Sequence, residues 1–404
     1  MHVKLLIQLS WRNIWRYRRR NGMLLVAIFV AVAGIVLTNA IIRGYQYDMV
    51  DDAVMNLTGH VKVLAPGYQE DPSIQKSFSL PSDWKPGVPT SEVEGWTSRI
   101  NIPAVIMSER ETRGIQLLGV YPAREREISF LGKADITGDY LSGPEDHRIL
   151  IGKALAEQLE TDIGRRLVVI TQGADGLNRE VGFRIAGLFD AEGTMLEKLF
   201  VFTGITTLQK VLDTRAVTEV SVRLQSDSET PSVEQEMTKE FNKLDVLDWR
   251  KLQPQAAAMF EYANGAILVW FLIMMLALAF GLINTLITAV MERVRELGML
   301  RALGMRAGYV VAQVVIESEL IVLLGLVLGI VAGVGLVHYF SDGIDLSRWA
   351  AGVEMAGIRS VLVPRLRTED LVLVSGLSLL FGIVASLYPA WRAVKIKPLD
   401  ALRR

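Results

Sequence analysis

Charged residues crowd into a short segment that directly follows a long apolar run, Gly265–Val290. They are Glu292, Arg293, Arg295, Glu296 and Arg301. The apolar residues between them recur every three positions, which favours a short amphipathic helix at a membrane surface. The pairs Glu292/Arg295 and Arg293/Glu296 are spaced for i,i+3 ion pairing, and Gly304 can end such a helix. Taken alone, such a segment is most often a charged turn between two spans.

Motifs for catalysis, phosphate binding or metal binding are missing from the sequence. No Gly-x-x-x-x-Gly-Lys-Ser/Thr loop, His-Glu-x-x-His motif or Gly-x-Ser-x-Gly elbow occurs. The four histidines show no ligand spacing and are expected at the surface: His2, His60, His147 and His338. The absence of cysteine excludes disulfides and thiolate metal sites. We therefore predict no enzyme activity and no catalytic, cofactor-binding or metal-binding residues in this chain.

Two acidic residues, Glu317 and Glu319, lie in the third apolar run. A charge at the centre of a span costs about 2.5–3.5 kcal/mol, which the apolar residues of this run can offset. Acidic residues at such depth usually face a bundle interior or water and suggest function; a hydrated interfacial pair is an equal alternative. Gly325, Gly329 and Gly333 are spaced four apart in the same run, which suits close helix packing within the bundle or across a dimer.

Four apolar runs are each long enough, at about 20 residues, to cross a bilayer. A basic segment with Trp11 and Trp15 precedes the first run and suits the headgroup region. Because a span follows it at once, we do not expect a nucleic-acid partner. The first run exceeds the roughly 7–15 residues of a signal-peptide core and is interpreted as an uncleaved anchor. The predicted segments are a basic interfacial helix 1–20, span 21–43, an inserted domain 44–263, span 264–290, a coupling segment 291–308, span 309–337, a loop 338–369, span 370–391 and a tail 392–404.

Lysine and arginine are distributed unevenly among the short segments. The N-terminal segment carries six, residues 291–308 four and residues 389–404 five, whereas residues 338–369 carry four that are balanced by four acidic residues. The positive-inside rule then places both termini and residues 291–308 in the cytoplasm. The inserted domain and the 338–369 loop are accordingly expected on the extracytoplasmic side.

The inserted domain mixes strand and helix patterns, so the fold class is a four-span membrane protein with a large α+β extracytoplasmic domain between spans 1 and 2. Alternating and β-rich segments predict strands. They are Gly59–Ala65, Val105–Met107, Ile115–Tyr121, the start of Ile149–Leu159, Leu167–Thr171, Val181–Phe189, Lys198–Thr203 and Val220–Leu224. The domain is expected to have two lobes. The stretch Pro66–Pro89 is expected to be a loop. Asp48, Asp51 and Asp52 are interpreted as a solvated stalk next to the membrane.

Three stretches resemble the permease subunits of the MacB/LolC/LolE/FtsX family of ABC transporters. The first is a span containing Asn284 followed by Glu292-Arg-x-Arg-Glu-Leu-Gly-x-Leu-Arg-Ala-Leu-Gly304. The second is the ending Pro389-Ala-x-Arg-Ala, followed by Pro398-x-x-Ala-Leu-Arg403. The third is Ile151-Gly-x-x-Leu-Ala, Gly164-x-x-Leu and Phe183-x-Ile-Ala-Gly-Leu-Phe in the inserted domain, a looser match.

The resemblance implies a multi-pass permease of the bacterial inner membrane, worked by a cytoplasmic ABC ATPase dimer that binds ATP and magnesium. The residues implied to dock with that ATPase are Glu292, Arg293, Arg295, Glu296, Leu297, Gly298, Leu300, Arg301 and Gly304. A second permease copy or a paralogue is expected to complete the core among membrane lipids. The leading function is release of lipoprotein or export of another amphiphilic cargo. The alternatives are FtsX-like activation of an extracytoplasmic hydrolase and MacB-like efflux of peptides or antibiotics through an adaptor.

Overall fold

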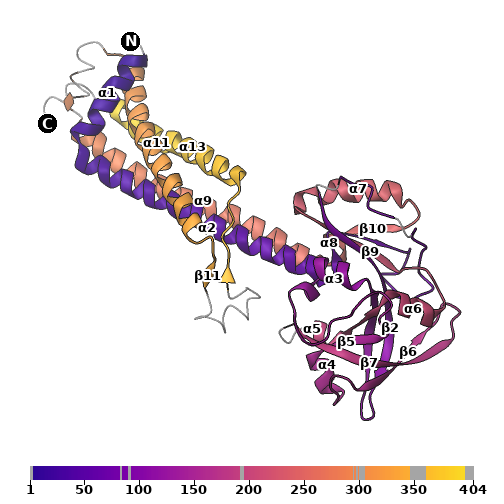
Figure 1. Ribbon diagram of the computed structural model, residues 1–404. Helices are drawn as coiled ribbons and strands as arrows, with labels where there is room; N and C mark the ends of the chain where they lie inside the picture. The colour runs from indigo at the N-terminus through magenta and orange to yellow at the C-terminus, as the bar shows by residue number, and fades with distance from the viewer. Residues whose placement is uncertain are drawn as a thin grey trace. The chain divides into compact units, whose positions relative to one another are not determined.

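The chain divides into two compact units, shown in a computed structural model (Figure 1). The membrane unit comprises Met1–Asp48 with Phe260–Arg404, and the sheet domain comprises Met49–Met259. The structure describes residues 3–81, 84–89, 92–191, 195–293, 295, 296, 299, 305–345 and 361–395. Each unit is treated separately below.

Among these residues, four helices are long and apolar enough to cross a membrane, which confirms the predicted class. They are α2 (Arg18–Ala53), α9 (Pro254–Glu292), α11 (Ala307–Tyr339) and α13 (Thr368–Lys395). A shorter helix, α1 (Val3–Arg16), precedes them. A pair of short antiparallel strands, β11 (Ile344–Asp345) and β12 (Val361–Leu362), lies between α11 and α13 in the chain. Within the unit, α11 packs against α13 and α1.

The helices α2 and α9 run beyond the predicted spans. They have 36 and 39 residues, whereas a bilayer requires about 20. Their helical ends, up to Ala53 and from Pro254, were assigned by sequence to the inserted domain. The apolar runs end at Arg43 and begin again at Gly265, and the predicted spans are bounded there. The more polar stretches just outside them, 44–53 and 254–264, are also helical, so a fall in hydropathy does not mark the end of a helix.

Three glycines of α11 lie directly against α2. A Cβ atom at Gly325, Gly329 or Gly333 would lie 2.7 Å from side-chain carbons of Ile28, Val32 and Val36, respectively. Their spacing therefore brings two helices of the same chain together, the first of the two arrangements considered above. On α13, Gly382 gives similar room to Glu319, whose Oε1 would lie 2.6 Å from such a Cβ atom.

The sheet domain is built on a ten-stranded mixed sheet in the order β10-β1-β9-β2-β3-β8-β5-β7-β4, with β6 paired to β2 and β7. The strands are β1 (Val61–Leu64), β2 (Val93–Met107), β3 (Thr112–Val120), β4 (Asp135–Gly138), β5 (Arg148–Gly152), β6 (Arg166–Gln172), β7 (Asn178–Asp190), β8 (Phe200–Gly204), β9 (Glu219–Leu224) and β10 (Asp245–Asp248). The β3–β8 and β5–β7 pairs are parallel. The helices are α3 (Pro122–Ile128), α4 (Lys153–Gln158), α5 (Met195–Leu199), α6 (Ile205–Leu212), α7 (Thr230–Glu240) and α8 (Trp249–Leu252).

The sheet domain contains several apolar cores within one compact unit, so the two expected lobes stay a prediction. One core surrounds Val220 and Val222 of β9 with Val233 of α7, and a second surrounds Leu155 and Leu208. The long strand β2 serves these two cores, because its first half pairs with β9 and its second half with β3 and β6.

A buried ionic network crosses the domain at Arg99 of β2, which is 0% exposed. Its Nε and Nη2 donate to the two carboxylate oxygens of Glu125 at 2.7 and 2.9 Å, and its Nη1 donates to Glu219 Oε1 at 3.0 Å. Nη1 also donates to the carbonyl of Leu57 at 2.8 Å, just after α2. Burial alone would raise the pKa of Glu219, but the charges of Lys62 and Arg99 hold it below its ordinary value.

Two expectations about polar residues in this domain are wrong. Asp51 is not part of a solvated stalk, because it pairs with Lys133 at 2.8 Å and with Arg223 at 3.3 Å. His60 is not at the surface: 7% of it is exposed, and its Nδ1 accepts a hydrogen bond from the Leu224 amide at 3.0 Å. Burial lowers the pKa of His60 to about 4, among the opposing charges of Asp227, Arg223, Asp51 and Arg250.

We expect the sheet domain to lose stability as the pH falls from 6.5 towards 4. Over this range the unfolded chain binds a proton at His60 and the folded chain does not, so acid favours unfolding. The expected loss between pH 7 and pH 5 is about 2 kcal/mol, measured by urea unfolding of the full chain. His60→Gln, which can still accept from Leu224, should flatten this part of the profile. An unchanged pH dependence in the variant would show that other groups cause it.

Candidate functional site

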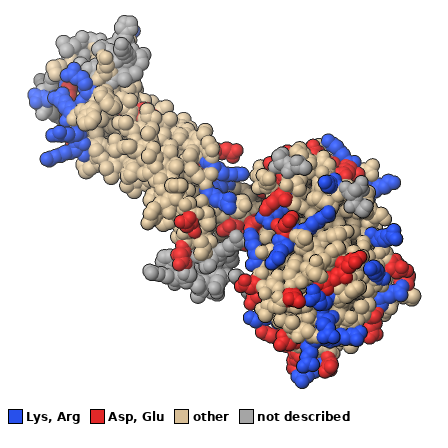
Figure 2. All heavy atoms as spheres, viewed as in Figure 1, with Lys and Arg blue, Asp and Glu red and all other residues tan. Residues whose placement is uncertain are grey.

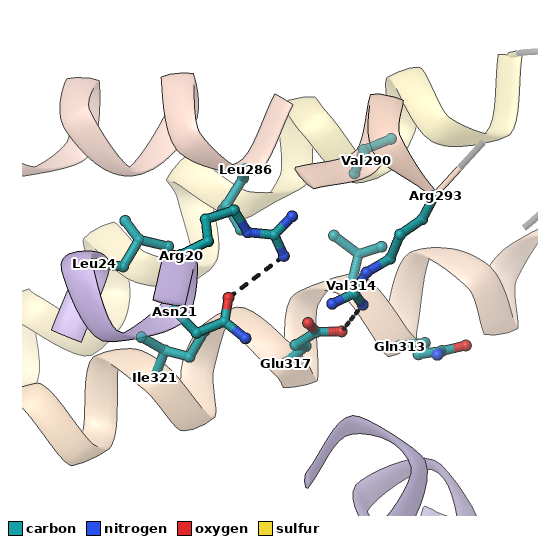
Figure 3. Close-up of a pocket in the computed structure, with 10 residues that line it drawn as sticks. All are labelled: Arg20, Asn21, Leu24, Leu286, Val290, Arg293, Gln313, Val314, Glu317 and Ile321. Carbon is teal, nitrogen blue, oxygen red and sulfur yellow. Dashed lines mark hydrogen bonds and ion pairs between the residues drawn. The ribbon is translucent and has the colours of Figure 1, made fainter. Parts of the chain in front are cut away.

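The charged segment after α9 begins in a cluster of polar side chains from three helices of the membrane unit (Figure 3). Arg293 follows the last residue of α9, and its Nη1 donates to Glu317 Oε2 of α11 at 2.8 Å. Both side chains are about nine-tenths buried. The same carboxylate oxygen accepts from Asn13 Nδ2 of α1 at 3.5 Å. One of the two acidic residues of the third span is therefore neutralised by the charged segment.

Residues at the junction of α1 and α2 hold two further residues of this segment, Glu292 and Glu296. Arg20 Nη1 lies 2.7 Å from Glu292 Oε2, and Arg16 Nη2 lies 3.3 Å from Glu296 Oε1. Tyr17 donates its hydroxyl to the same Glu296 oxygen at 3.4 Å. Glu292 and Glu296 are about half exposed, and an ion pair of this kind contributes at most about 1 kcal/mol. These contacts set the position of the segment more than they stabilise the fold.

Tyr17 also stacks with the arginines around it. The guanidinium carbon of Arg293 lies 4.0 Å from the centre of the Tyr17 ring, and that of Arg20 lies 5.3 Å from it. Cations over an aromatic face are attracted by its quadrupole, more strongly when they are desolvated. Tyr17 thus contacts both arginines, one that pairs with Glu292 and one that pairs with Glu317.

The predicted pairing within the segment is wrong. Arg293 pairs with Glu317 and not with Glu296, and Glu292 pairs with Arg20 and not with Arg295. The physical reason is that Glu292 still belongs to α9, so it and Arg293 face other helices of the bundle. Five of the predicted docking residues lie outside the described part of the chain: Leu297, Gly298, Leu300, Arg301 and Gly304.

The residues that hold the segment were not predicted as site residues. The N-terminal basic run was interpreted as a headgroup-binding segment, and the pairing partners in it are Arg16, Tyr17 and Arg20. The only signal for this pairing was that the six basic residues of the N-terminal segment have no acidic residue near them in the sequence. They need acidic partners from elsewhere in the chain, and Glu292 and Glu296 could provide them.

A second polar cluster ties three helices together through Arg43 of α2. Its Nε and Nη2 donate to the two oxygens of Asp370 of α13 at 3.0 and 2.9 Å. Its Nη1 donates to Gln46 and to Asn264 of α9 at 2.9 and 3.1 Å. Sequence analysis missed this cluster, because its members are single polar residues at the ends of different spans.

Two family models match the chain. The model described as MacB-like periplasmic core domain covers residues 22–240, which is more than half of the chain. The model described as FtsX-like permease C-terminal covers residues 268–398. The chain belongs to the family of permeases that carry these MacB-like and FtsX-like domains. The predicted resemblance is thereby confirmed over both units.

Relatives of this permease are similar over most of its length. The lipoprotein-releasing system transmembrane protein LolC of Xylella fastidiosa is 24% identical, and the match covers 96% of each chain. The macrolide export ATP-binding/permease protein MacB of Bdellovibrio bacteriovorus is 22% identical over 95% of this chain and 59% of the relative. Among solved structures, the periplasmic region of MacB from Actinobacillus actinomycetemcomitans covers 50% of this chain at 11% identity, with a TM-score of 0.36.

The protein is thus an ABC transporter permease of the LolC, MacB and FtsX type and a multi-pass membrane protein. Its homologues are permease subunits, which is consistent with a non-catalytic membrane subunit and supports an ATPase as its partner. The polar cluster at the end of α9 lies within the FtsX-like part of the match, apart from the residues contributed by α1 and α2.

Proposed function

We propose that this permease is driven by a separate cytoplasmic ABC ATPase dimer, which docks on residues 291–308 and supplies the sites for ATP and magnesium. Both termini and this segment would lie in the cytoplasm of a bacterium, and the sheet domain would lie outside its inner membrane. The orientation is supported by the basic side chains gathered at the end of the membrane unit that holds α1 and the start of α2 (Figure 2), because positive residues favour the cytoplasmic side.

The arrangement of Glu292, Arg293 and Glu296 is the observation that carries this proposal. Each is held by a residue of another helix, so a movement of the segment would be passed directly to α1, α2 and α11. Arg295 is exposed and remains available to a partner. Nucleotide-driven closure of the ATPases would shift this segment and, through α2 and α9, act on the sheet domain.

A second permease copy or a paralogue would complete the membrane core. The span α9 supports this, because apolar side chains along it are exposed in the single chain, including Leu268, Leu272, Leu276 and Phe280. The work performed would be the release of lipoprotein or the export of another amphiphilic cargo. This cargo is supported by the LolC relative, which is matched over 96% of its length.

The test is a reconstitution of the full chain with its ATPase and a second permease subunit in vesicles that carry a lipoprotein. We expect ATP-dependent release, and we expect Glu296→Arg to lower both ATPase capture and release about tenfold. The new arginine would repel Arg16, and the substitution would remove the carboxylate that accepts the Tyr17 hydroxyl.

Glu261→Arg is the matched control, because Glu261 is an exposed glutamate of α9 outside the segment 291–308 and its substitution makes the same charge change. Normal capture by Glu296→Arg would refute the docking role of this segment. ATP hydrolysis without lipoprotein release would instead reject the cargo, and activation of a cell-wall hydrolase by the same complex would favour the FtsX-like alternative.

A further inference from the structure

A pocket at the charged end of the membrane unit is lined by two arginines, each of which has an N–H group without a hydrogen-bond acceptor (Figure 3). Only 7% of Arg293 is exposed, and while its Nη1 pairs with Glu317, its Nε and Nη2 have no hydrogen-bond acceptor. The Nε of Arg20 is likewise buried without an acceptor. A buried donor without a partner costs about 1–3 kcal/mol, and more on a charged group, so three such donors in one pocket point to an anionic ligand.

The pocket combines an apolar wall with polar side chains, which besides the arginines are Asn21, Gln313 and Glu317. Its apolar lining residues come from α2, α9 and α11 and are Leu24, Leu286, Val290, Val314 and Ile321. The charged lining residues are Arg20, Arg293 and Glu317. Arg20 pairs with Glu292 and Arg293 with Glu317, so these charges balance, and what remains is N–H groups of the two arginines without acceptors. A ligand that matches this lining presents several acceptor oxygens, as an anionic group does, and an apolar body.

We propose that this pocket binds the phosphate group of an anionic phospholipid, with the beginning of an acyl chain against the apolar wall. A phosphodiester carries a single negative charge and presents oxygens that guanidinium groups bind in a fork geometry. Basic pockets between membrane helices on the cytoplasmic side are suited to anionic headgroups. The side of the membrane rests on the proposed function.

The surroundings place the pocket at headgroup depth. Trp11 and Trp15 of α1 are 43% and 65% exposed, and exposed tryptophans concentrate at membrane interfaces. Arg20 and Arg293 also hold the residues of the coupling segment, since Arg20 pairs with Glu292 and Arg293 begins the turn after α9. A bound lipid would therefore fix the position from which the coupling segment starts.

The experiment measures the lipids retained by the full-length protein in the absence of any ATPase. The protein is reconstituted in nanodiscs of phosphatidylcholine with a minor fraction of phosphatidylglycerol, released, and analysed by native mass spectrometry. We expect phosphatidylglycerol to be enriched on the protein. Arg20→Gln, and separately the neutral double variant Arg293→Gln/Glu317→Gln, should lower that enrichment about tenfold, as the loss of a charge-assisted hydrogen bond predicts.

Arg19→Gln is the matched control. Arg19 is exposed and does not line the pocket, so this variant loses the same charge next to the same membrane surface. Enrichment that stays at the wild-type level in both Arg20→Gln and Arg19→Gln would overturn the proposal, even if the double variant failed to fold. Enrichment that falls by the same factor in both variants would show a diffuse electrostatic attraction and would also overturn it.

Two further arms separate the other anions that the pocket could accept. Inorganic phosphate in phosphatidylcholine nanodiscs should leave the thermal stability of the protein unchanged; stabilisation that requires Arg20 would assign the pocket to free phosphate. If Arg20→Gln abolished ATPase capture but kept the lipid, the pocket would belong to the protein interface. Because lipid retention is measured without ATPase, its failure would leave the proposed function untouched, and failure of the Glu296→Arg test would leave the lipid site untouched.

Discussion

Replacing Arg99 with methionine should lower the free energy of unfolding of the sheet domain by about 3–5 kcal/mol, because it removes one partner of a buried ionic network. The carboxylates of Glu125 and Glu219 are 0% and 1% exposed, and Arg99 binds both. Glu219 would keep Lys62 at 3.2 Å, but Glu125 would lose both of its charged hydrogen bonds. Pulse proteolysis of the full chain in increasing urea measures this loss.

The matched control for this prediction is Arg113→Met. Arg113 pairs with Glu111 at 3.2 Å, and both side chains are more than 40% exposed, so the expected loss is below about 1 kcal/mol. The double variant Arg99→Met/Glu125→Gln should recover part of the stability, because it removes the charge that was left behind. Similar losses for Arg99→Met and Arg113→Met would mean that the buried network does not stabilise the domain.

The burial of Arg99 and its hydrogen-bond partners could not be predicted from the sequence. A charged residue within a strand is usually assigned to the solvent face, and the first half of β2, which contains Arg99, was not predicted as a strand at all. Its acceptors lie on α3, on β9 and just after α2, at sequence separations of 26, 120 and 42 residues. Only the folded topology brings these groups together.

Long apolar runs and alternating strands could be predicted, because each reflects a local periodicity of the chain. The four spans and the strands β1, β3, β6, β7 and β9 were found in this way. The coupling segment was found from its charge density, but not its partners, because Arg20 and Glu292 are 272 positions apart. Local spacing suggested i,i+3 pairs, and the packing of α1, α2 and α11 supplied closer ones.

The glycines of α11 fall between these cases, since their spacing predicted a close approach of helices but not which helix approaches. The structure places α2 there, and this assignment can be tested. Gly329→Leu should destabilise the membrane unit by about 3 kcal/mol, because even a Cβ atom would lie 2.7 Å from the Cβ of Val32, which is 0% exposed. Thermal unfolding of the full chain in detergent, followed by loss of helical circular dichroism, measures the effect.

Gly335 provides the matched control on the same helix, because a Cβ atom there would meet no atom within 4 Å. Gly335→Leu should therefore leave the melting temperature nearly unchanged, and it adds the same side chain at the same cost in backbone freedom. Exchanging the two contacting residues, with Gly329→Val and Val32→Gly, should restore part of the stability, since the methyl groups move from one helix to the other. If Gly329→Leu instead left the single chain stable and only abolished its association with a second permease subunit, the glycines would form a seam between subunits. The close contact with α2 would then not be the reason that glycine is required at these positions.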